Sequence, residues 1–276
     1  MEQGVTCVVP ARLGSTRFPG KLLKLIEGKP VVVHALARAA EAACFDQVIC
    51  FTDSVEIAEA VRAHGFACAL TGDADNGTER IARHLDALPA LSNGEDTNLI
   101  VNLQGDEPAF PVEGLRTLCA ALRKHPDLAH ILVHNDAPSA EDLANPNRVK
   151  VAVDSLGFAR DFVRIVPAAT QGIRQDALTA AIYRLQLGAY GYSRAYLQRY
   201  ATLSRSAREI ELSHELLRAG DHQPGWVPVR AHFSAPAASV DVPEDLDLAR
   251  AALAALPPHK NFASHDSQHA LQGTLS

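Results

Sequence analysis

The sequence predicts an α/β fold in which a mainly parallel sheet is wound by crossover helices and a smaller lobe is added. Short apolar runs, typical of buried strands, alternate with Ala-rich stretches of helical periodicity in the first part of the chain. The first apolar run opens directly into a loop with Gly, Arg and Lys, a common setting for an anion at the carboxyl end of a parallel strand. After Asp106 the alternation loosens, which indicates an inserted part of different build.

Each element of the first part follows from its local pattern. Apolar runs of strand length are bounded by polar turns, and the segments between them are longer, rich in Ala and apolar on one side. The predicted strands are Thr6–Val9, Gln47–Thr52, Ala67–Leu70 and Leu99–Leu103, and the predicted helices are Val31–Ala43, Val55–His64 and Glu79–Leu88. Strands that alternate with helices in this way favour parallel pairing.

The second part is predicted to be richer in strands. Irregular polar loops separate its apolar runs, and helical patterns return only near its end. The predicted strands are Ile131–His134, Val149–Val153, Phe158–Arg164, Gly188–Tyr192 and Val227–Phe233, with helices near Arg194–Tyr200 and Ile210–Arg218 and a last helix opened by Asp241-Val242-Pro243-Glu244-Asp245 and running to Leu256. From Pro257 the sequence is polar and without periodicity, so residues 257–276 are expected to form a loose tail.

The composition is that of a globular protein. The 276 residues are 47% hydrophobic and 21% charged, which is enough to build one large core or two modest ones. The chain carries 26 basic and 32 acidic residues, a net charge of −6, so no overall field draws it to nucleic acid or to an anionic membrane. Any polyanion that the protein binds must therefore be held locally.

Several features predict a cytoplasmic location. No apolar stretch has the length of a transmembrane helix, and the N-terminus enters a strand without a signal-type segment. The five cysteines are scattered, with no C-x-x-C pair and no histidine at metal-ligand spacing, and their odd number argues against an oxidised secreted framework. We interpret them as small core residues.

The loop Pro10-Ala11-Arg12-Leu13-Gly14-Ser15-Thr16-Arg17-Phe18-Pro19-Gly20-Lys21 is the most informative segment. Backbone N–H groups and fixed cations after a buried strand are suited to grip phosphate oxygens, and such a grip indicates a nucleotide. The spacing fits neither a Walker loop nor Gly-x-Gly-x-x-Gly. A solvated basic surface loop is the alternative.

This ordered segment resembles the signature of sugar nucleotidyltransferases with a Rossmann-like fold, and within them the 3-deoxy-manno-octulosonate (Kdo) cytidylyltransferase family. The resemblance covers roughly the first 250 residues in order. It implies that CTP is the nucleotide and that Arg12 and Lys21 neutralise its triphosphate. Pro10, Ala11, Ser15 and Arg17 would contact the nucleotide with them.

A second matching segment is Asn102-Leu103-Gln104-Gly105-Asp106-Glu107-Pro108 at the end of a predicted buried strand. A carboxylate there points into the cleft above the sheet, and Mg²⁺ prefers such oxygen ligands together with phosphates. The resemblance implies that Asp106 binds Mg²⁺ and that Gln104 and Gly105 contact the nucleotide. A turn carboxylate that caps the next segment is the alternative.

A second carboxylate, Asp241, lies in Ser239-Val240-Asp241-Val242-Pro243-Glu244-Asp245-Leu246. From the residues alone it is as well explained as the N-cap of the last helix, because a Pro-initiated helix follows. The resemblance implies that it is the second Mg²⁺ ligand. Both roles in one residue are also compatible with the sequence.

The segment Asp75-Asn76-Gly77-Thr78-Glu79-Arg80 is predicted to be a turn that enters a helix. Its free N–H groups can meet a base edge or a phosphate, and Arg80 adds a cation. The resemblance implies that Asn76, Gly77, Thr78 and Arg80 enclose the nucleotide, with Asn76 where the family has Ser. A plain helix start is the alternative.

The acceptor side is expected in the second part of the chain. The resemblance points to Gln104, Lys150, Arg164, Gln186, Tyr190, Tyr192 and Glu211 as acceptor-binding residues, although a solvated edge-strand lysine explains Lys150 equally well. Val163 stands where the family usually has Ser, Gln186 where it has His, and the family's Glu-x-x-Glu-Gln-Leu-Arg becomes the segment Glu211 to Arg218. Losing a hydroxyl and an ionisable ring predicts altered acceptor recognition.

Together these observations predict a CTP-dependent cytidylyltransferase that forms a CMP-activated acidic acceptor and releases pyrophosphate. Arg12, Lys21, Asp106 and Asp241 carry catalysis by charge and positioning, with Mg²⁺ as the cofactor and no protein nucleophile or general base assigned. The expected acceptor is a small phosphonate resembling phosphonoformate, or a modified sugar acid. Kdo itself is the alternative acceptor.

A catalytically silent nucleotide-binding protein is the alternative of another class, and the four intact charged residues speak against it. We expect one nucleotidyltransferase domain over residues 1–256. Its nucleotide-binding part would span about 1–110, its acceptor-binding part about 111–235 and its return to the core about 236–256. We also expect a homodimer, with no nucleic acid or membrane partner.

Overall fold

A mixed β-sheet forms the centre of the molecule. This computed structural model describes residues 3–15, 17–91, 98–166, 183–222 and 229–256. The strands of the main sheet are β1 (Val5–Ala11), β4 (Gln47–Thr52), β5 (Ala67–Leu70), β6 (Leu99–Leu103), β7 (Ala129–His134), β8 (Lys150–Val153), β9 (Phe158–Val163), β10 (Tyr183–Ser193) and β11 (Val229–Ser234). A separate hairpin joins β2 (Leu25–Ile26) to β3 (Lys29–Pro30).

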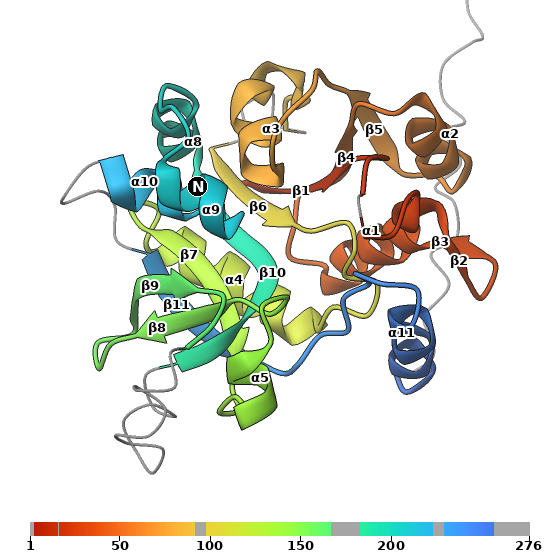
Figure 1. Ribbon diagram of the computed structural model, residues 1–276. Coiled ribbons are helices and arrows are strands. Elements are labelled where there is room, and N and C mark those ends of the chain that lie inside the picture. Colours follow the sequence, from red (N-terminus) through yellow and green to blue (C-terminus); the bar gives the residue numbers. More distant parts are fainter. Residues whose placement is uncertain (1–2, 16, 92–97, 167–182, 223–228, 257–276) are drawn as a thin grey trace, which may run out of the picture.

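The described strands lie in the order β5-β4-β1-β6-β10-β7-β11-β9-β8 (Figure 1). The pairs β5–β4, β4–β1 and β1–β6 are all parallel, as the sequence predicts. Beyond β6 the prediction of a mainly parallel sheet is wrong. Strand β10 runs antiparallel to β6, β7 and β8, and β9 runs antiparallel to both β8 and β11.

In this part β11 and β7 remain parallel, and the antiparallel pair β8–β9 has a simple local cause. Strands β8 and β9 are joined by a turn at residues 154–157, which is too short for the crossover that parallel neighbours need. Gly157 takes a φ of 81° in this turn, a conformation that side chains disfavour. The extra pairing of β10 with β8 closes the last five strands of the sheet order into a ring.

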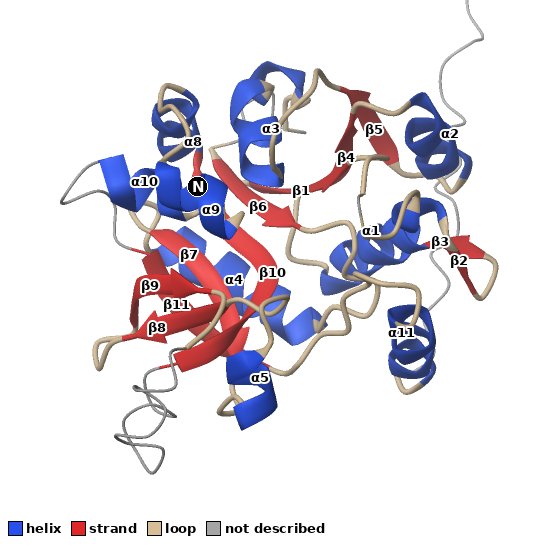
Figure 2. Ribbon diagram, in the orientation of Figure 1, coloured by secondary structure: helices blue, strands red, loops and turns tan. Residues whose placement is uncertain are grey.

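The helices cover both faces of the sheet (Figure 2). They are α1 (Val31–Ala42), α2 (Val55–Ala63), α3 (Gly77–Arg83), α4 (Val112–Lys124), α5 (Ala140–Ala144), α8 (Arg194–Ala201), α9 (Ala207–Leu212), α10 (Leu217–His222) and α11 (Asp245–Ala254), with 3-10 turns η1 (Lys21–Leu23) and η2 (Leu85–Ala87). In the described chain no helix is long and apolar enough to cross a membrane.

Alternation along β1 divides the core into two layers. Val5, Cys7 and Val9 belong to a cluster with α1, α2, α4 and α11, whereas Val8 belongs to a cluster with α3, α8 and α10. Buried strands that are apolar on both faces need helices on both sides. The parallel half of the molecule is therefore a layered α/β core.

Some predicted elements differ in extent. The helix predicted to reach Leu88 ends at Arg83 and is followed by η2, and β10 is longer than the run from Gly188 to Tyr192. Helix α4 was not predicted, although Leu115, Leu118 and Leu122 recur on one face and are buried. Val227, the predicted start of β11, and the predicted tail lie outside the described residues.

The helix predicted over Ile210–Arg218 is broken in the structure. Helix α9 ends at Leu212, and Ser213 has a φ of 48° in the left-handed region, where a regular helix cannot continue. Helix α10 begins only at Leu217. The interruption presents residues 213–215 to the cavity described below.

A buried ion-pair network fastens α10 to α3 and α9. Arg218 donates to Glu79 at 3.0 Å and to Glu209 at 2.7 Å, and all three side chains are at most 2% exposed. Removing one member of a buried network leaves its partners charged and desolvated.

We expect Arg218→Met to lower the free energy of unfolding by about 3 kcal/mol or more, because two carboxylates lose their buried cation. Urea denaturation followed by circular dichroism measures it. Arg250→Met is the matched control: its ion pair with Asp247 is exposed, and its loss should cost less than about 0.5 kcal/mol. Equal losses in both variants would contradict the prediction.

Candidate active site

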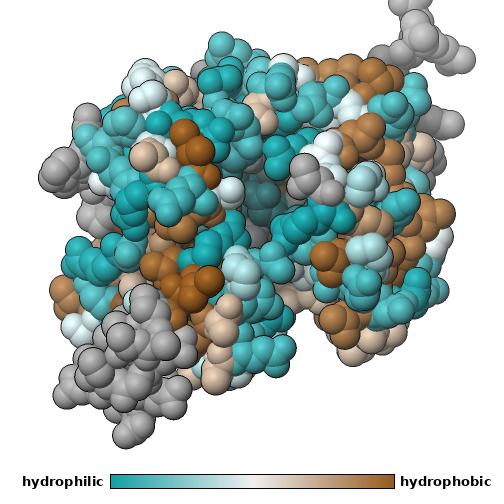
Figure 3. Space-filling view, in the orientation of Figure 1, coloured by the Kyte–Doolittle hydropathy of each residue, from teal (hydrophilic) through white to brown (hydrophobic). Residues whose placement is uncertain are grey.

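A polar cavity of about 740 Å³ opens at the carboxyl ends of β1 and β6 and reaches β10. Figure 3 shows it as a central hollow lined by hydrophilic side chains. Its walls come from both parts of the chain, and they include segments that follow β1, β6, β7, β10 and β11. Ligands of open α/β sheets commonly bind at this end of the parallel strands.

Lys21 lies between the two carboxylates that the sequence singles out. Its Nζ is 2.5 Å from Oδ2 of Asp106 and 3.1 Å from Oδ1 of Asp241. Burial lowers the pKa of Lys21, but the two carboxylates outweigh it and raise that pKa above its ordinary value. The ammonium therefore stays charged and holds two like charges close together.

The backbone brings these residues together from distant segments. Asp106 follows β6, and its carbonyl accepts a hydrogen bond of 2.8 Å from the N–H of Val240, next to Asp241. Gly20 has a φ of 66° and starts the turn that aims Lys21 into the cavity. Arg17 donates to Asp241 and to Asn147, both at 2.9 Å, and so links the first loop to the far wall.

Asp241 is not a helix cap. The residue preceding α11 is Glu244, which makes no side-chain cap hydrogen bond. Instead the carboxylate of Asp245 accepts from the N–H groups of Asp241 and Val242 at 2.8 and 2.9 Å. The Asp241 side chain faces Lys21 and Arg17, so the interpretation as an N-cap is wrong.

The predicted nucleotide segments meet at one end of the cavity. Arg12 donates to the carbonyl of Asp75 at 3.3 Å, and Asn76 caps α3 by accepting from Glu79 N at 2.8 Å. A Cβ on Gly77 would lie 2.8 Å from Pro10 and 2.9 Å from Gln104, so only glycine allows this close approach. Pro10, Ala11, Arg12, Ser15, Arg17, Lys21, Asn76, Gly77, Gln104 and Gly105 all line the cavity.

Thr78 and Arg80 are placed differently. The Thr78 hydroxyl is fully buried against Glu215 and Tyr192, and Thr78 is not among the cavity-lining residues of the described chain. Arg80 reaches the cavity wall, but its guanidinium donates to Asp53, Thr71 and the carbonyl of Gly72. Both residues hold the first turn of α3 in place.

The predicted acceptor residues divide into two groups. Gln104, Arg164, Gln186 and Tyr190 line the cavity, whereas Lys150, Tyr192 and Glu211 do not. Lys150 is fully buried and donates to the carbonyls of Asn145 at 2.5 Å and Arg164 at 2.6 Å, so it is not a solvated edge lysine either. Tyr192 is fully buried, with its hydroxyl hydrogen-bonded to Thr78, and Glu211 is exposed on α9.

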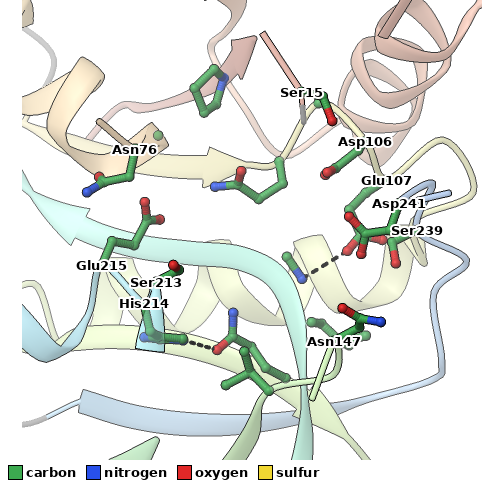
Figure 4. Close-up of a pocket in the computed structure, with 18 of the residues that line it drawn as sticks. Ser15, Asn76, Asp106, Glu107, Asn147, Ser213, His214, Glu215, Ser239 and Asp241 are labelled. Atoms are coloured by element: carbon green, nitrogen blue, oxygen red, sulfur yellow. Dashed lines mark hydrogen bonds between the residues drawn. The ribbon is translucent and has the colours of Figure 1, made fainter. Parts of the chain in front are cut away.

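Several cavity residues were missed. Ser213, His214 and Glu215 lie on one side and Glu107 and Ser239 on the other, beside Asp106 and Asp241 (Figure 4). Burial, with Asp106 next, raises the pKa of Glu107 to about 8. Glu107 lies within the motif from Asn102 to Pro108, next to Asp106, and could have been found there. His214 could not have been found, because the sequence predicts a continuous helix over Ile210–Arg218 and gives no sign of the turn at Ser213.

The carboxylates of the cavity suit a hard cation whose coordination is completed by oxygen atoms of a substrate. Within the described residues no group of three or more His, Cys, Asp or Glu side chains is placed to hold a metal ion alone. Asp106 and Asp241 offer two carboxylates around one cationic point, which fits Mg²⁺ completed by phosphate oxygens and water.

Comparisons with known proteins agree with this geometry. A family profile described as "Cytidylyltransferase" matches residues 6–221. The chain belongs to the cytidylyltransferase family. A 3-deoxy-manno-octulosonate cytidylyltransferase of Anaeromyxobacter sp. (strain Fw109-5) is 38% identical over 92% of this chain and 98% of that protein. One from Pseudomonas syringae pv. tomato is 37% identical over 92% of this chain and its own full length.

Two solved structures are similar to this cytidylyltransferase. A structure of CMP:2-keto-3-deoxy-manno-octonic acid synthetase complexed with CTP has a TM-score of 0.78 and 32% identity, over 91% of this chain and 99% of that one. The 4-diphosphocytidyl-2C-methyl-D-erythritol synthase of Anaerococcus prevotii, at 15% identity and a TM-score of 0.55, shares the fold. The resemblance to Kdo cytidylyltransferases is confirmed, and with it the enzyme class, a CTP-dependent nucleotidyltransferase.

The different roles of Asp241 and Asp245 are testable. We expect Asp245→Ala to lower the free energy of unfolding by about 1 kcal/mol, because two backbone N–H groups lose their acceptor. Asp241→Ala should cost less than half as much, since it also relieves repulsion from Asp106. Urea denaturation of both variants measures this, with the exposed Asp247→Ala as control. A larger loss of unfolding free energy in Asp241→Ala than in Asp245→Ala would support Asp241 as the N-cap.

Proposed function

We propose that this cytidylyltransferase transfers CMP from CTP to Kdo and releases pyrophosphate. The names of the full-length relatives support this acceptor. The structural observation that carries the proposal is the lining of the acceptor side, which offers an amide, a phenol, an imidazole and a hydroxyl at Gln186, Tyr190, His214 and Ser213. Neutral groups that donate and accept hydrogen bonds suit a polyhydroxylated sugar acid.

The expected phosphonate acceptor loses its basis. That expectation depended on the loss of a hydroxyl at Val163 and of an imidazole at Gln186. Val163 is not among the residues that line the cavity, and the ring of His214 lies directly against Gln186. Ser213 supplies a hydroxyl and His214 an imidazole from another segment of the chain. The relatives also favour Kdo as the acceptor.

For the nucleotide side we propose that Arg12 and Lys21 balance the charge of the triphosphate, which grows on the leaving pyrophosphate as the bond to the α-phosphorus breaks. An acceptor oxygen attacks that phosphorus in line. Pro10, Ala11, Ser15, Arg17, Asn76, Gly77, Gln104 and Gly105 shape the surrounding pocket, while Thr78 and Arg80 support it from behind.

We further propose that Asp106 and Asp241 hold Mg²⁺. Bound there, the ion would neutralise phosphate charge and lower the cost of bringing two anions together. Gln104, Arg164, Gln186 and Tyr190 would contact the acceptor. Lys150 acts through Arg164, whose carbonyl it binds, and Tyr192 acts through Thr78. Glu211 is exposed and does not line the cavity, so no contact is proposed for it.

We expect pyrophosphate release with CTP to be at least tenfold faster, as kcat/KM, for Kdo than for phosphonoformate, a gap of about 1.4 kcal/mol in transition-state binding. A coupled pyrophosphate assay over a panel of sugar acids and phosphonates measures this, and ATP, GTP and UTP serve as donor controls. A phosphonate with a higher kcat/KM than Kdo would contradict the proposal and support the phosphonate acceptor that the sequence predicts.

We expect Asp106→Asn and Asp241→Asn each to lower kcat by about 100-fold or more, because a neutral amide is a poor ligand for a hard cation. Chelation with EDTA should abolish turnover of the wild-type enzyme, and added Mg²⁺ should restore it. Asp247→Asn, exposed on α11, is the control and should keep full turnover. Full turnover in either active-site variant would remove that carboxylate from the reaction.

A further inference from the structure

His214 is a buried imidazole at the edge of the acceptor site. It is 4% exposed and lines the cavity beside Gln186 and Arg164 (Figure 4). Its ring stacks on Phe162 with 4.5 Å between ring centroids, so its orientation is fixed by packing. The turn at Ser213 that ends α9 delivers it there.

A chain of hydrogen bonds leads from this ring to the cavity. His214 Nε2 contacts Oε1 of Gln186, and Nε2 of Gln186 donates to the hydroxyl of Tyr190. An amide oxygen only accepts, so the hydrogen in the first contact belongs to His214 Nε2. The order of donors is therefore imidazole, amide, phenol.

The direction of the chain follows from the protonation of the ring. Burial, aided by Arg164, lowers the pKa of His214 to about 3, so the ring is neutral and carries one N–H. Nδ1 is buried and has no hydrogen-bond partner in the described chain. Turning the Gln186 amide round would move the ring hydrogen to Nδ1 and reverse the order of donors, so the tautomer of the ring decides the direction of the chain.

This order of donors determines how the Tyr190 hydroxyl is oriented. Its hydroxyl oxygen accepts from Gln186, and among the described residues this is its one hydrogen bond. Burial raises the pKa of Tyr190 well above its ordinary value, so the hydroxyl keeps its hydrogen. Since Tyr190 lines the cavity, that hydrogen remains to be donated to a bound ligand.

We propose that His214 is a positioning residue for acceptor recognition, which orients the Gln186 amide and thereby directs the Tyr190 hydroxyl hydrogen at an oxygen of the acceptor. The inference rests on the proposed function in taking that acceptor to be Kdo. The recognised group is an oxygen that accepts a hydrogen bond, a carboxylate or hydroxyl of the sugar acid.

Steady-state kinetics of two His214 variants test the proposal. His214→Leu removes the donor and keeps the bulk, and should raise KM for Kdo about tenfold with little change in KM for CTP. His214→Gln returns an amide N–H near the position of Nε2 and should recover most of that loss. A loss through packing alone would change both KM values and would not be recovered by Gln.

A double-mutant cycle with Tyr190→Phe tests the connection. If His214 acts through Tyr190, the double variant His214→Leu/Tyr190→Phe should have the same KM for Kdo as Tyr190→Phe alone. Independent, multiplying effects would overturn the proposal. His130→Leu is the matched control, because His130 is fully buried and hydrogen-bonded to His232 away from the cavity, and its KM values should not change.

A readout without substrate separates this inference from the proposed function. Nitrogen-15 NMR of the free enzyme should find the Nε2–H tautomer of His214, and Gln186→Leu should alter its signal. An Nδ1–H tautomer would overturn the inference whatever the acceptor is. If the tautomer is as expected and Kdo is not a substrate, the acceptor assignment fails and the hydrogen-bond chain stands.

Discussion

The ammonium of Lys21 between Asp106 and Asp241 is the contact on which the active-site geometry depends. Two carboxylates repel each other and are costly to keep partly buried, so the cation between them is what holds them close together. Their segments lie 135 residues apart, yet Val240 pairs with the backbone of Asp106 and keeps both carboxylates at one cation. Charges preset in this way suit the metal and the triphosphate that we propose for this site.

A second set of contacts joins the nucleotide side to the acceptor side. The Glu215 carboxylate accepts from the Thr78 hydroxyl at 2.9 Å and from the Thr78 N–H at 3.2 Å, at the first turn of α3. Tyr200 holds the carbonyl of Glu215, and Arg218 reaches Glu79. The loop that carries His214 is therefore tied to the first turn of α3, which fixes the distance between the proposed acceptor side and the proposed nucleotide side of the cavity.

The acceptor side shows how a linear motif can mislead. In the linear sequence, Gln186 stands where the resembling family has a histidine, so this motif by itself lacks an ionisable ring for the acceptor side. In the fold, His214 packs its ring against Gln186, and the neutral pair carries both an amide and an imidazole. Neither segment alone predicts this pair, because serine is not a residue that favours the left-handed turn found at Ser213.

Local patterns determined the parallel half of the fold, the loop from Pro10 to Lys21 and the acidic residue at the end of β6, because strand alternation and strand-end placement are written in neighbouring residues. Tertiary structure decided the rest. The ring of five strands, the contact of Asp241 with Arg17 in place of a helix cap, the burial of Lys150 and the place of His214 all depend on contacts between segments far apart in the chain. Such contacts form only when the whole core packs, so no local pattern could specify them.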